Sequence, residues 1–265
     1  MRSVVATRYV TPFREGGSVP GLVEADDEGM YVLKFRGAAQ GPRAVVAEWI
    51  AGEIARALGL PVPEIVAIEL DPRLGDAEPD QEIQDLIKAS GGLNIGLDFL
   101  PGALPFSPAA GSRPDAGFAA DLVWFDAFVT NPDRSVQNPN LLVWHGRPWL
   151  IDHGAALYIH HTWRDPDAHA IRPFERSRDH VLLPYAGSIV EADERLATRI
   201  DEGLLATIVE AVPESWLPRD QVIGGASAQR RAYVTYLAHR LAGPRAFAEE
   251  AERARQEAER ARSAA

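Results

Sequence analysis

Apolar residues in the first hundred positions occur in short runs separated by turn-forming residues. Two such runs lie on either side of residues 26–29, an Asp-Asp-Glu-Gly turn, and together they predict a β-hairpin. The other runs are rich in β-branched residues, which favour strands. The strands expected from this pattern are residues 22–25, 30–35, 65–70 and 93–100.

A different spacing of apolar residues, close to one in every four, predicts helices. Pro42 suits the first turn of the earliest helix and Gly59 suits its end, and between them the apolar residues Val46, Ile50 and Ile54 share one face. Similar spacing recurs further along the chain. The remaining helices expected are residues 82–88, 117–129, 191–212 and 226–242.

Residues 101–117 are rich in proline, glycine, alanine and serine, and we place a boundary between two lobes there. The expected division is residues 1–101 as a mainly β first lobe, residues 102–243 as a mainly helical second lobe, and residues 244–265 as a charged helix. This last segment repeats alanine, glutamate and arginine, which favours ion pairs four residues apart on a solvent-exposed helix.

Composition narrows the kind of protein. The 265 residues carry a formal net charge of −11, which disfavours binding to duplex nucleic acid or to an anionic membrane surface. The chain has no cysteine, so disulfides, zinc–thiolate sites and thiol catalysis are excluded. No apolar stretch has the length of a membrane-spanning helix, and residues 1–10 do not resemble a signal peptide, so a cytoplasmic location is expected.

The clearest chemical signal surrounds a second predicted hairpin. Residues 141–144 and 149–151 are apolar and are separated by a four-residue turn. A hairpin brings its outer ends together, so Asn138 before the first strand should meet Asp152 after the second. Asp133 precedes Asn138 by five residues, close enough to join them. One amide oxygen and two carboxylates form an oxygen-rich site that suits Mg²⁺ and phosphoryl transfer.

The order Asp-x4-Asn, strand, turn, strand and Asp-x-Gly resembles the catalytic and metal-binding loops of protein kinases. With Asn-Pro-Asp-Arg at residues 131–134, it resembles the HipA-like kinases most closely and the phosphoinositide kinases more distantly. The resemblance implies an α+β, two-lobed, protein-kinase-like fold with a mainly antiparallel β N-lobe and a mainly α-helical C-lobe. It implies ATP and Mg²⁺ as cofactors, Asp133 as the catalytic base or hydroxyl-orienting group, and Asn138 and Asp152 as metal ligands.

The resemblance extends to the first lobe, where kinases need a strand lysine. Lys34 is one of two lysines among 27 basic residues and lies in a predicted strand. Glu48 on the following helix is its implied catalytic partner; a solvent-exposed Glu48, and Glu53 as the partner instead, are the alternatives. The implied nucleotide contacts are Gly16, Gly17 and Ser18 of a glycine-containing loop within residues 11–21, Lys34 itself, and Asp98, Phe99 and Leu100 of a hinge strand.

Two other function classes stay open. Asn131, Ser135 and His153 depart from the usual kinase residues, which is compatible with a nucleotide-binding pseudokinase that acts as an interaction module. Six of the seven histidines fall within residues 145–180, so a metal-dependent hydrolase using the aspartates and nearby histidines is the other alternative. For a kinase, the expected acceptor is a hydroxyl, of a protein serine or threonine first and of a small molecule second. The acceptor's identity and the oligomeric state stay open.

Overall fold

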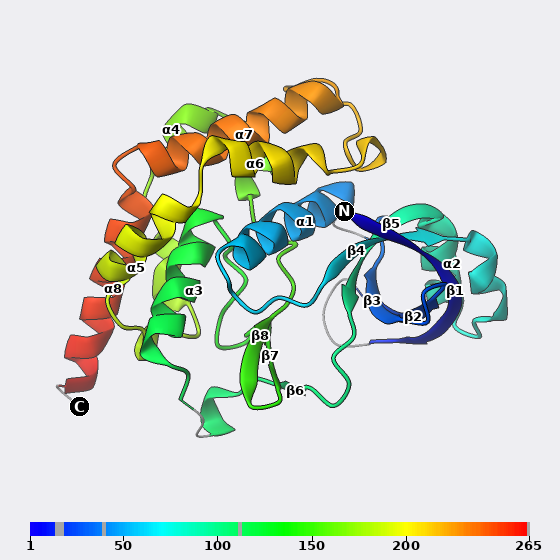
Figure 1. Ribbon diagram of the computed structural model, residues 1–265, viewed down its shortest axis with the longest axis horizontal. Coiled ribbons are helices and arrows are strands. Elements are labelled where there is room, and N and C mark those ends of the chain that lie inside the picture. The colour runs from blue at the N-terminus through cyan, green and yellow to red at the C-terminus, as the bar shows by residue number, and fades with distance from the viewer. Residues whose placement is uncertain (14–18, 39–40, 111–112, 264–265) are drawn as a thin grey trace.

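The computed structural model describes residues 1–13, 19–38, 41–110 and 113–263 of an α+β protein. A closed barrel of five strands lies at one end and most helices gather at the other, with α1 (Gly41–Ala57) between them (Figure 1). The barrel strands are β1 (Arg2–Pro12), β2 (Gly21–Ala25), β3 (Met30–Lys34), β4 (Ile65–Leu70) and β5 (Gly92–Asp98). Within the described ranges, no helix is both long enough and apolar enough to span a membrane.

The barrel strands are ordered β1-β2-β3-β5-β4, and β1 closes the barrel by pairing in parallel with β4. The other four pairings are antiparallel, as expected for a mainly antiparallel sheet. Our prediction of a loop over residues 11–21 is wrong at its start, because β1 extends to Pro12 and pairs it with Gly21. Of the residues in β1 only Val4 and Ala6 are buried, so this strand carries a weak apolar signal in the sequence.

A hydrophobic core fills the barrel. Successive side chains of a strand lie on opposite faces, so alternate residues of the strands point inward. Leu33, Val66 and Ile68 are completely buried there, and α2 (Gln81–Ala89) adds Ile83 and Ile87 to the same core. The predicted hairpin over β2 and β3, the strands β4 and β5, and the helix expected at residues 82–88 are all confirmed.

Helix α1 is buried on nearly all sides, and ten of its residues between Val45 and Ala55 are buried. The indole Nε1 of Trp49 donates to the carbonyl oxygen of Ile208 in α6 (Glu202–Glu210) at 2.9 Å. On another side, Gly52 lies so close to β4 that an added Cβ would come 2.3 Å from Cδ1 of Ile65. The helix therefore packs against both the barrel and the helical part.

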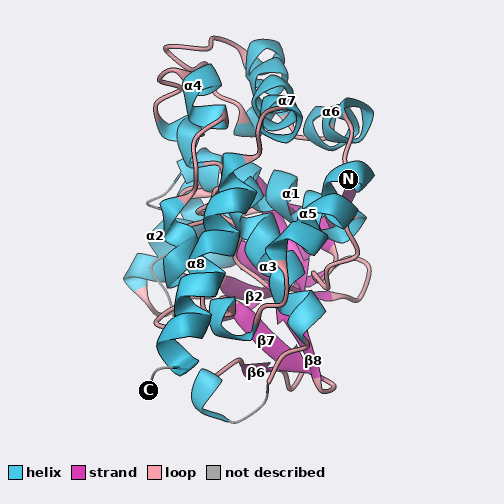
Figure 2. Ribbon diagram, turned by 90° about the vertical axis from the view of Figure 1, so that its left-hand side faces the viewer, coloured by secondary structure: helices cyan, strands magenta, loops and turns pink. Residues whose placement is uncertain are grey.

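The helical part has a second core built around stacked aromatic rings. Trp124 and Phe128 of α3 (Ala116–Phe128) stack with ring centroids 5.5 Å apart, and Phe247 of α8 (Ala246–Ser263) packs against both. Helix α8 runs beside α3 and α5 (Ile189–Leu196) (Figure 2). We expected a solvent-exposed helix here, but its face carrying Phe247 and Ala251 is buried, and only the outer face carries ion pairs such as Arg255–Glu259.

The predicted helix at residues 191–212 is divided into α5 and α6, because Asp201 accepts a hydrogen bond from the backbone N–H of Leu204 and so begins a new helix. The helix expected at residues 226–242 is confirmed as α7 (Ala226–Ala242). One short helix, α4 (Pro166–Ala170), was not predicted. Short 3₁₀ turns are η1 (Pro72–Ala77), η2 (Pro108–Ala110), η3 (Tyr158–His161), η4 (Glu175–Asp179), η5 (Leu183–Tyr185), η6 (Ala197–Arg199) and η7 (Glu214–Trp216).

The second hairpin is present as β7 (Leu141–Trp144) and β8 (Arg147–Leu150), with the two-residue strand β6 (Leu104–Pro105) on the other side of β7. Its turn is tighter than the four residues predicted. His145 and Gly146 both have positive φ, 49° and 74°, as in the type I′ turns that best match the twist of paired strands. The two residues that follow, Arg147 and Pro148, therefore belong to β8.

Candidate functional site

Lys34, the last residue of β3, lies at the centre of a charged cluster between the barrel and α1. Its Nζ lies 2.5 Å from Glu48 Oε2 and 2.6 Å from Asp152 Oδ1. The Glu48 side chain is completely buried and that of Lys34 is 15% exposed, whereas the Asp152 side chain is 38% exposed. The structure thus brings together three residues from β3, α1 and the segment after β8. Glu53, the alternative partner, instead pairs with Arg56 at 3.3 Å.

This cluster is ionic. Burial opposes the charged form of Glu48, but Lys34 and His153 outweigh it and hold the pKa of the carboxyl well below its usual range. Burial likewise opposes the charge on Lys34, and the carboxylates of Asp152 and Glu48 raise its pKa above the ordinary value. At neutral pH the lysine is therefore positive and both carboxylates next to it favour that charge.

His153, the residue after Asp152, holds the buried glutamate in place. Its backbone N–H donates to Glu48 Oε2 at 2.9 Å, and its Nδ1 lies 3.3 Å from Glu48 Oε1. The ring is completely buried and packs edge-on against Phe125. The departure from Asp-Phe-Gly that the sequence shows at this position therefore puts a hydrogen-bond donor on the partner of Lys34.

Asp133 and Asn138 meet on the loop between α3 and β7. Asp133 Oδ2 accepts hydrogen bonds from Nδ2 of Asn138 at 2.9 Å and from Nδ2 of Asn140 at 3.3 Å. Beyond β8 the backbone N–H of Ile151 donates to the carbonyl oxygen of Asn140 at 3.1 Å. The segments that carry Asn138 and Asp152 therefore run side by side.

A buried polar network that was not predicted from the sequence supports this loop. Arg134, only 1% exposed, places its Nε 2.5 Å from Asp126 Oδ2, and His180 Nε2 lies 3.0 Å from the same oxygen. Asn131 donates to the other carboxylate oxygen at 2.9 Å. Burial opposes the ionised form of Asp126, yet Arg134 and His180 hold its pKa below the usual range. An aspartate inside the apolar sequence of α3 is the one signal that could have pointed to this network.

The other histidines are engaged singly. His160 Nδ1 lies 3.0 Å from the hydroxyl of Tyr233, and His169 Nδ1 lies 2.9 Å from the hydroxyl of Tyr236. His180 accepts the backbone N–H of Leu182 at Nδ1, so its Nε2 is free to donate to Asp126. Among the residues with described positions, no three histidines, aspartates or glutamates are grouped so as to hold a metal ion. The rings of His160 and His161 contact each other, but the described histidines do not converge on one site. Their clustering in the sequence therefore lends no support to the hydrolase alternative.

The oxygen atoms around the hairpin ends suit a hard divalent cation. Asn138 uses its amide nitrogen on Asp133, which leaves the amide oxygen for another partner. Asp152 uses Oδ1 on Lys34, and Oδ2 accepts no hydrogen bond from any described residue. Asp152 also has a positive φ of 55°, an uncommon conformation that turns this residue out of the strand direction. One amide oxygen and one carboxylate oxygen are donors that Mg²⁺ accepts, so the predicted metal ligands fit.

The predicted hinge lies where β5 leaves the barrel. The backbone N–H of Asp98 donates to the carbonyl oxygen of Glu64 at 2.8 Å, and that of Phe99 donates to the carbonyl oxygen of Met30 at 2.9 Å. Both N–H groups are therefore used within the fold. The N–H of Leu100 has no acceptor among the described residues. Of the three hinge amides, only that of Leu100 is therefore available to a ligand.

The glycines of the predicted nucleotide loop, Gly16 and Gly17, and Ser18 lie outside the described residues. The flanks of that loop are joined by a 2.7 Å hydrogen bond from the backbone N–H of Phe13 to the carbonyl oxygen of Pro20. The ring of Phe13 lies 6.3 Å from that of Phe99. The loop therefore starts beside the hinge.

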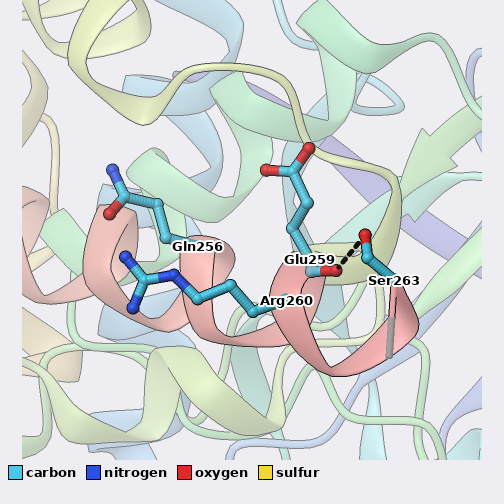
Figure 3. Close-up of a pocket in the computed structure, with 4 residues that line it drawn as sticks. All are labelled: Gln256, Glu259, Arg260 and Ser263. Atoms are coloured by element: carbon cyan, nitrogen blue, oxygen red, sulfur yellow. Dashed lines mark hydrogen bonds between the residues drawn. The ribbon is translucent and has the colours of Figure 1, made fainter. Parts of the chain in front are cut away.

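A hollow of about 460 Å³ on α8 is not part of the candidate site around Lys34, Asp133 and Asp152. Gln256, Glu259, Arg260 and Ser263 line it, and all four belong to one helix (Figure 3). The hydroxyl of Ser263 donates to the carbonyl oxygen of Glu259, as expected within a helix end. We assign no function to this surface.

Comparison with known proteins agrees with the geometry. A model of the HipA-like kinase family matches residues 7–240, a range that includes Lys34, Glu48, Asp133, Asn138 and Asp152. No curated protein sequence matches the chain. The crystal structure of the Helicobacter pylori proinflammatory kinase CtkA is similar at a TM-score of 0.54 and 13% sequence identity, over 95% of this chain and 98% of that chain. At that identity the likeness shows a shared fold. With the family model covering most of its length, the chain belongs to the HipA-like kinase family.

Proposed function

We propose that this chain is an ATP-dependent phosphotransferase that moves the γ-phosphoryl group to a hydroxyl acceptor, with a protein serine or threonine as the expected acceptor. The observation that carries the proposal is Lys34 Nζ placed between Glu48 and Asp152, beside a loop in which Asp133 and Asn138 are hydrogen-bonded. Phosphoryl transfer depends mainly on positioning and charge stabilisation, and this arrangement offers both.

Each residue has a distinct role in this proposal. Lys34 neutralises charge on the α- and β-phosphates, and Glu48 fixes the lysine in place. Asn138 and Asp152 would hold Mg²⁺, which would offset the negative charge of the phosphates. Asp133 orients the acceptor hydroxyl and takes its proton as the oxygen bonds to phosphorus and the bond from the γ-phosphorus to ADP breaks. The products are a phosphate ester and ADP.

We infer that the barrel with α1 serves as the N-lobe and the helical part as the C-lobe, with nucleotide bound between them. Leu100 N–H lies at the strand end beside Phe99 and is the hinge amide left for adenine. Gly16, Gly17 and Ser18 would cover the phosphates from the loop that begins at Phe13. The division of the chain near residue 101 is part of this proposal.

The departures from the usual kinase residues are compatible with an active enzyme. Asn131, in place of the usual histidine, donates to Asp126 and accepts the backbone N–H of Asp133 at 3.1 Å. Ser135 accepts the backbone N–H of Asn138 at 3.2 Å. Both substitutions keep the loop in shape, so the geometry around Asp133 does not depend on the missing residues.

Thermal unfolding with and without Mg²⁺-ATP tests nucleotide binding. Ligand at about a hundred times its dissociation constant should stabilise the fold by about 2.7 kcal/mol. We expect Asp152→Asn to reduce this shift and Asp165→Asn to leave it unchanged, because Asp165 is exposed and makes no capping hydrogen bond. A wild-type protein without any Mg²⁺-ATP shift would contradict the proposal.

Transfer of labelled γ-phosphate to the chain itself and to a degenerate serine and threonine peptide library tests the chemistry. We expect Asp133→Asn to bind Mg²⁺-ATP normally while losing transfer by about a hundredfold or more, the usual size of general acid–base contributions. Nucleotide binding without transfer or hydrolysis in the wild type would instead establish the pseudokinase alternative.

A further inference from the structure

A hollow of about 390 Å³ adjoins the catalytic loop and has no role in the site described above. Thr130 and Pro132, the neighbours of Asn131, form part of its wall, and Pro132 directly precedes Asp133. The remaining wall comes from residues 158–176 and from α7. An occupant of this hollow would therefore lie next to the loop that we assign to the acceptor hydroxyl.

The hollow is strongly basic. Arg172, Arg176, Arg240 and His169 line it, and its described lining includes neither aspartate nor glutamate. The whole chain has 38 acidic and only 27 basic residues, so this concentration of positive charge runs against the overall balance. A concave surface lined by charge of one sign raises the local concentration of ligands of the opposite sign.

Arg240 is a buried positive charge in the floor of the hollow. It is 1% exposed, and its guanidinium donates to the carbonyl oxygens of Ala127, Phe128 and Ala170 at 2.8 to 3.0 Å. In the part of the chain that is described, it forms no ion pair with a carboxylate. Carbonyl groups satisfy its hydrogen bonds but do not cancel its charge, which leaves a net positive field in the hollow.

The other two arginines are available to a ligand. Arg172 is exposed, and its side chain contacts no acceptor among the residues whose positions are described. Arg176 pairs with Asp179 at 3.2 Å, but both side chains are at least half exposed, so this pair is weak and easily exchanged. Planar guanidinium groups bind phosphate oxygens in pairs, which makes arginine the residue suited to such anions.

His169 lies close to the same positive charges. Burial, together with the positive charges of Arg240 and Arg172, lowers the pKa of its ring. Its Nδ1 is engaged by the hydroxyl of Tyr236. An anion placed between these cations would offset the part of this lowering that the two arginines cause.

The hollow is apolar on one side and basic on the other. Tyr158, 60% exposed, and Phe174 give it an apolar side next to the arginines, so a ligand with a charged group on an extended carbon chain fits both surfaces. A phosphomonoester carries a charge of about −1.5 to −2 and three acceptor oxygens. It therefore attracts several guanidinium groups more strongly than a carboxylate, which carries a single charge and two oxygens.

We propose that this hollow binds the phosphate of a phosphoserine or phosphothreonine near the target hydroxyl of a protein acceptor, so that the chain acts on segments that already carry a phosphate. This inference rests on the proposed function, because it names the acceptor class of that site. In this proposal Lys34 binds the nucleotide and the arginines of the hollow bind the acceptor.

Paired peptide libraries test the proposal. Both contain a fixed acceptor serine with degenerate flanks, and one carries phosphoserine at a neighbouring position where the other carries serine or glutamate. We expect kcat/KM for the phosphoserine set to be at least about tenfold higher, the gain of one good charge-assisted contact. The double variant Arg172→Gln, Arg176→Gln should lose this preference through a higher KM. Arg164→Gln, an exposed arginine outside the hollow, should keep it.

Thermal unfolding with the phosphoserine peptide alone measures the hollow without nucleotide or turnover. We expect the peptide to stabilise the wild type and Arg164→Gln but not the double variant. The Mg²⁺-ATP shift should be the same in all three of these proteins. Equal rates on both libraries, or a preference that survives in the double variant, would overturn the inference. Lipid phosphorylation would also overturn it, if the chain phosphorylated phosphatidylcholine vesicles containing phosphatidylinositol 4-phosphate and did not phosphorylate the phosphopeptides. Loss of the Mg²⁺-ATP shift in the wild type would instead count against the proposed function alone.

Discussion

His153 is joined to Glu48 twice, by its backbone N–H at 2.9 Å and by its ring nitrogen at 3.3 Å. The glutamate that holds Lys34 is thus held by the neighbour of Asp152, which also contacts Lys34. The two carboxylates and the lysine therefore form a closed set of contacts in which His153 is the link. It acts as a positioning residue rather than a catalytic one.

We predict that His153→Phe, which restores the Asp-Phe-Gly motif, destabilises this protein. Phenylalanine keeps the backbone hydrogen bond but removes the ring donor, and hydrogen bonds to charged groups contribute about 1.5–3 kcal/mol. His153→Asn can replace Nδ1 with an amide N–H and should recover part of the loss. Urea denaturation measures both variants, and a phenylalanine variant as stable as the wild type would show that the ring contact contributes nothing.

Breaking the buried pair behind the catalytic loop should cost more. Arg134→Met leaves Asp126 in the interior with only His180 and Asn131, and removing one partner of a buried pair typically costs about 3–5 kcal/mol. The exposed pair Arg8–Glu24 offers a control, since water screens this pair and Arg8→Met should change stability far less. Guanidinium denaturation compares the two, and equal effects would contradict the role of the network.

Acid should destabilise the fold through His160. Burial, with smaller effects from His161 and Arg43, lowers its pKa from 6.5 to about 3, so between these values the unfolded chain binds a proton that the folded one does not. Stability from this group is complete above about pH 6.5 and is lost as the pH falls toward 3, by up to about 1.4 kcal/mol per pH unit.

His160→Asn should therefore flatten the fall in stability between pH 6.5 and 4 relative to wild type. Urea denaturation across this range measures the difference in unfolding free energy between the variant and the wild type. Taking the difference cancels the contribution of other titrating groups. His145→Asn, in the exposed hairpin turn where asparagine suits the positive φ, serves as the control and should keep the wild-type slope. Parallel curves for His160→Asn and the wild type would refute the assignment.

The contact between Gly52 and Ile65 predicts a substitution that acts on the site from a distance. A Cβ at position 52 would lie 2.3 Å from Ile65 Cδ1, and Gly52 follows Glu48 by one helical turn. Gly52→Ala should cost about 1–3 kcal/mol through overpacking and reduce the Mg²⁺-ATP shift by displacing Glu48. Gly225→Ala, where a Cβ meets open space, is the matched control. An unaltered melting temperature for Gly52→Ala would be the contrary result.

Local signals explain what the sequence could predict. The turn at residues 26–29 and the alternation around it specify the first hairpin, and α7 is predicted to the residue because its pattern is uninterrupted. Asp133, Asn138 and Asp152 could be proposed as one site because a hairpin relates the ends of its strands by simple geometry. All of these features depend on residues that are near one another in the sequence, so the pattern of a single sequence is enough to predict them.

The features that were missed depend on distant partners. Strand β1 buries few residues and forms because β4 lies parallel to it. Arg134 and Asp126 are eight residues apart, but His180, the third member of their network, comes 54 residues after Asp126. Glu48 looked as if it could be exposed because its partners come from β3 and from beyond β8. Nothing in a single sequence records such contacts.

The position of α1 has a consequence for how the protein folds. Although the predicted boundary falls after residue 101, α1 shares its core with α3 and α6, and Ile95 and Leu97 of the barrel belong to that core as well. Cutting the chain at that boundary would expose the apolar residues around Trp49 and leave Glu48 without His153. The barrel and the helices should therefore melt in a single cooperative transition, and neither half should fold on its own.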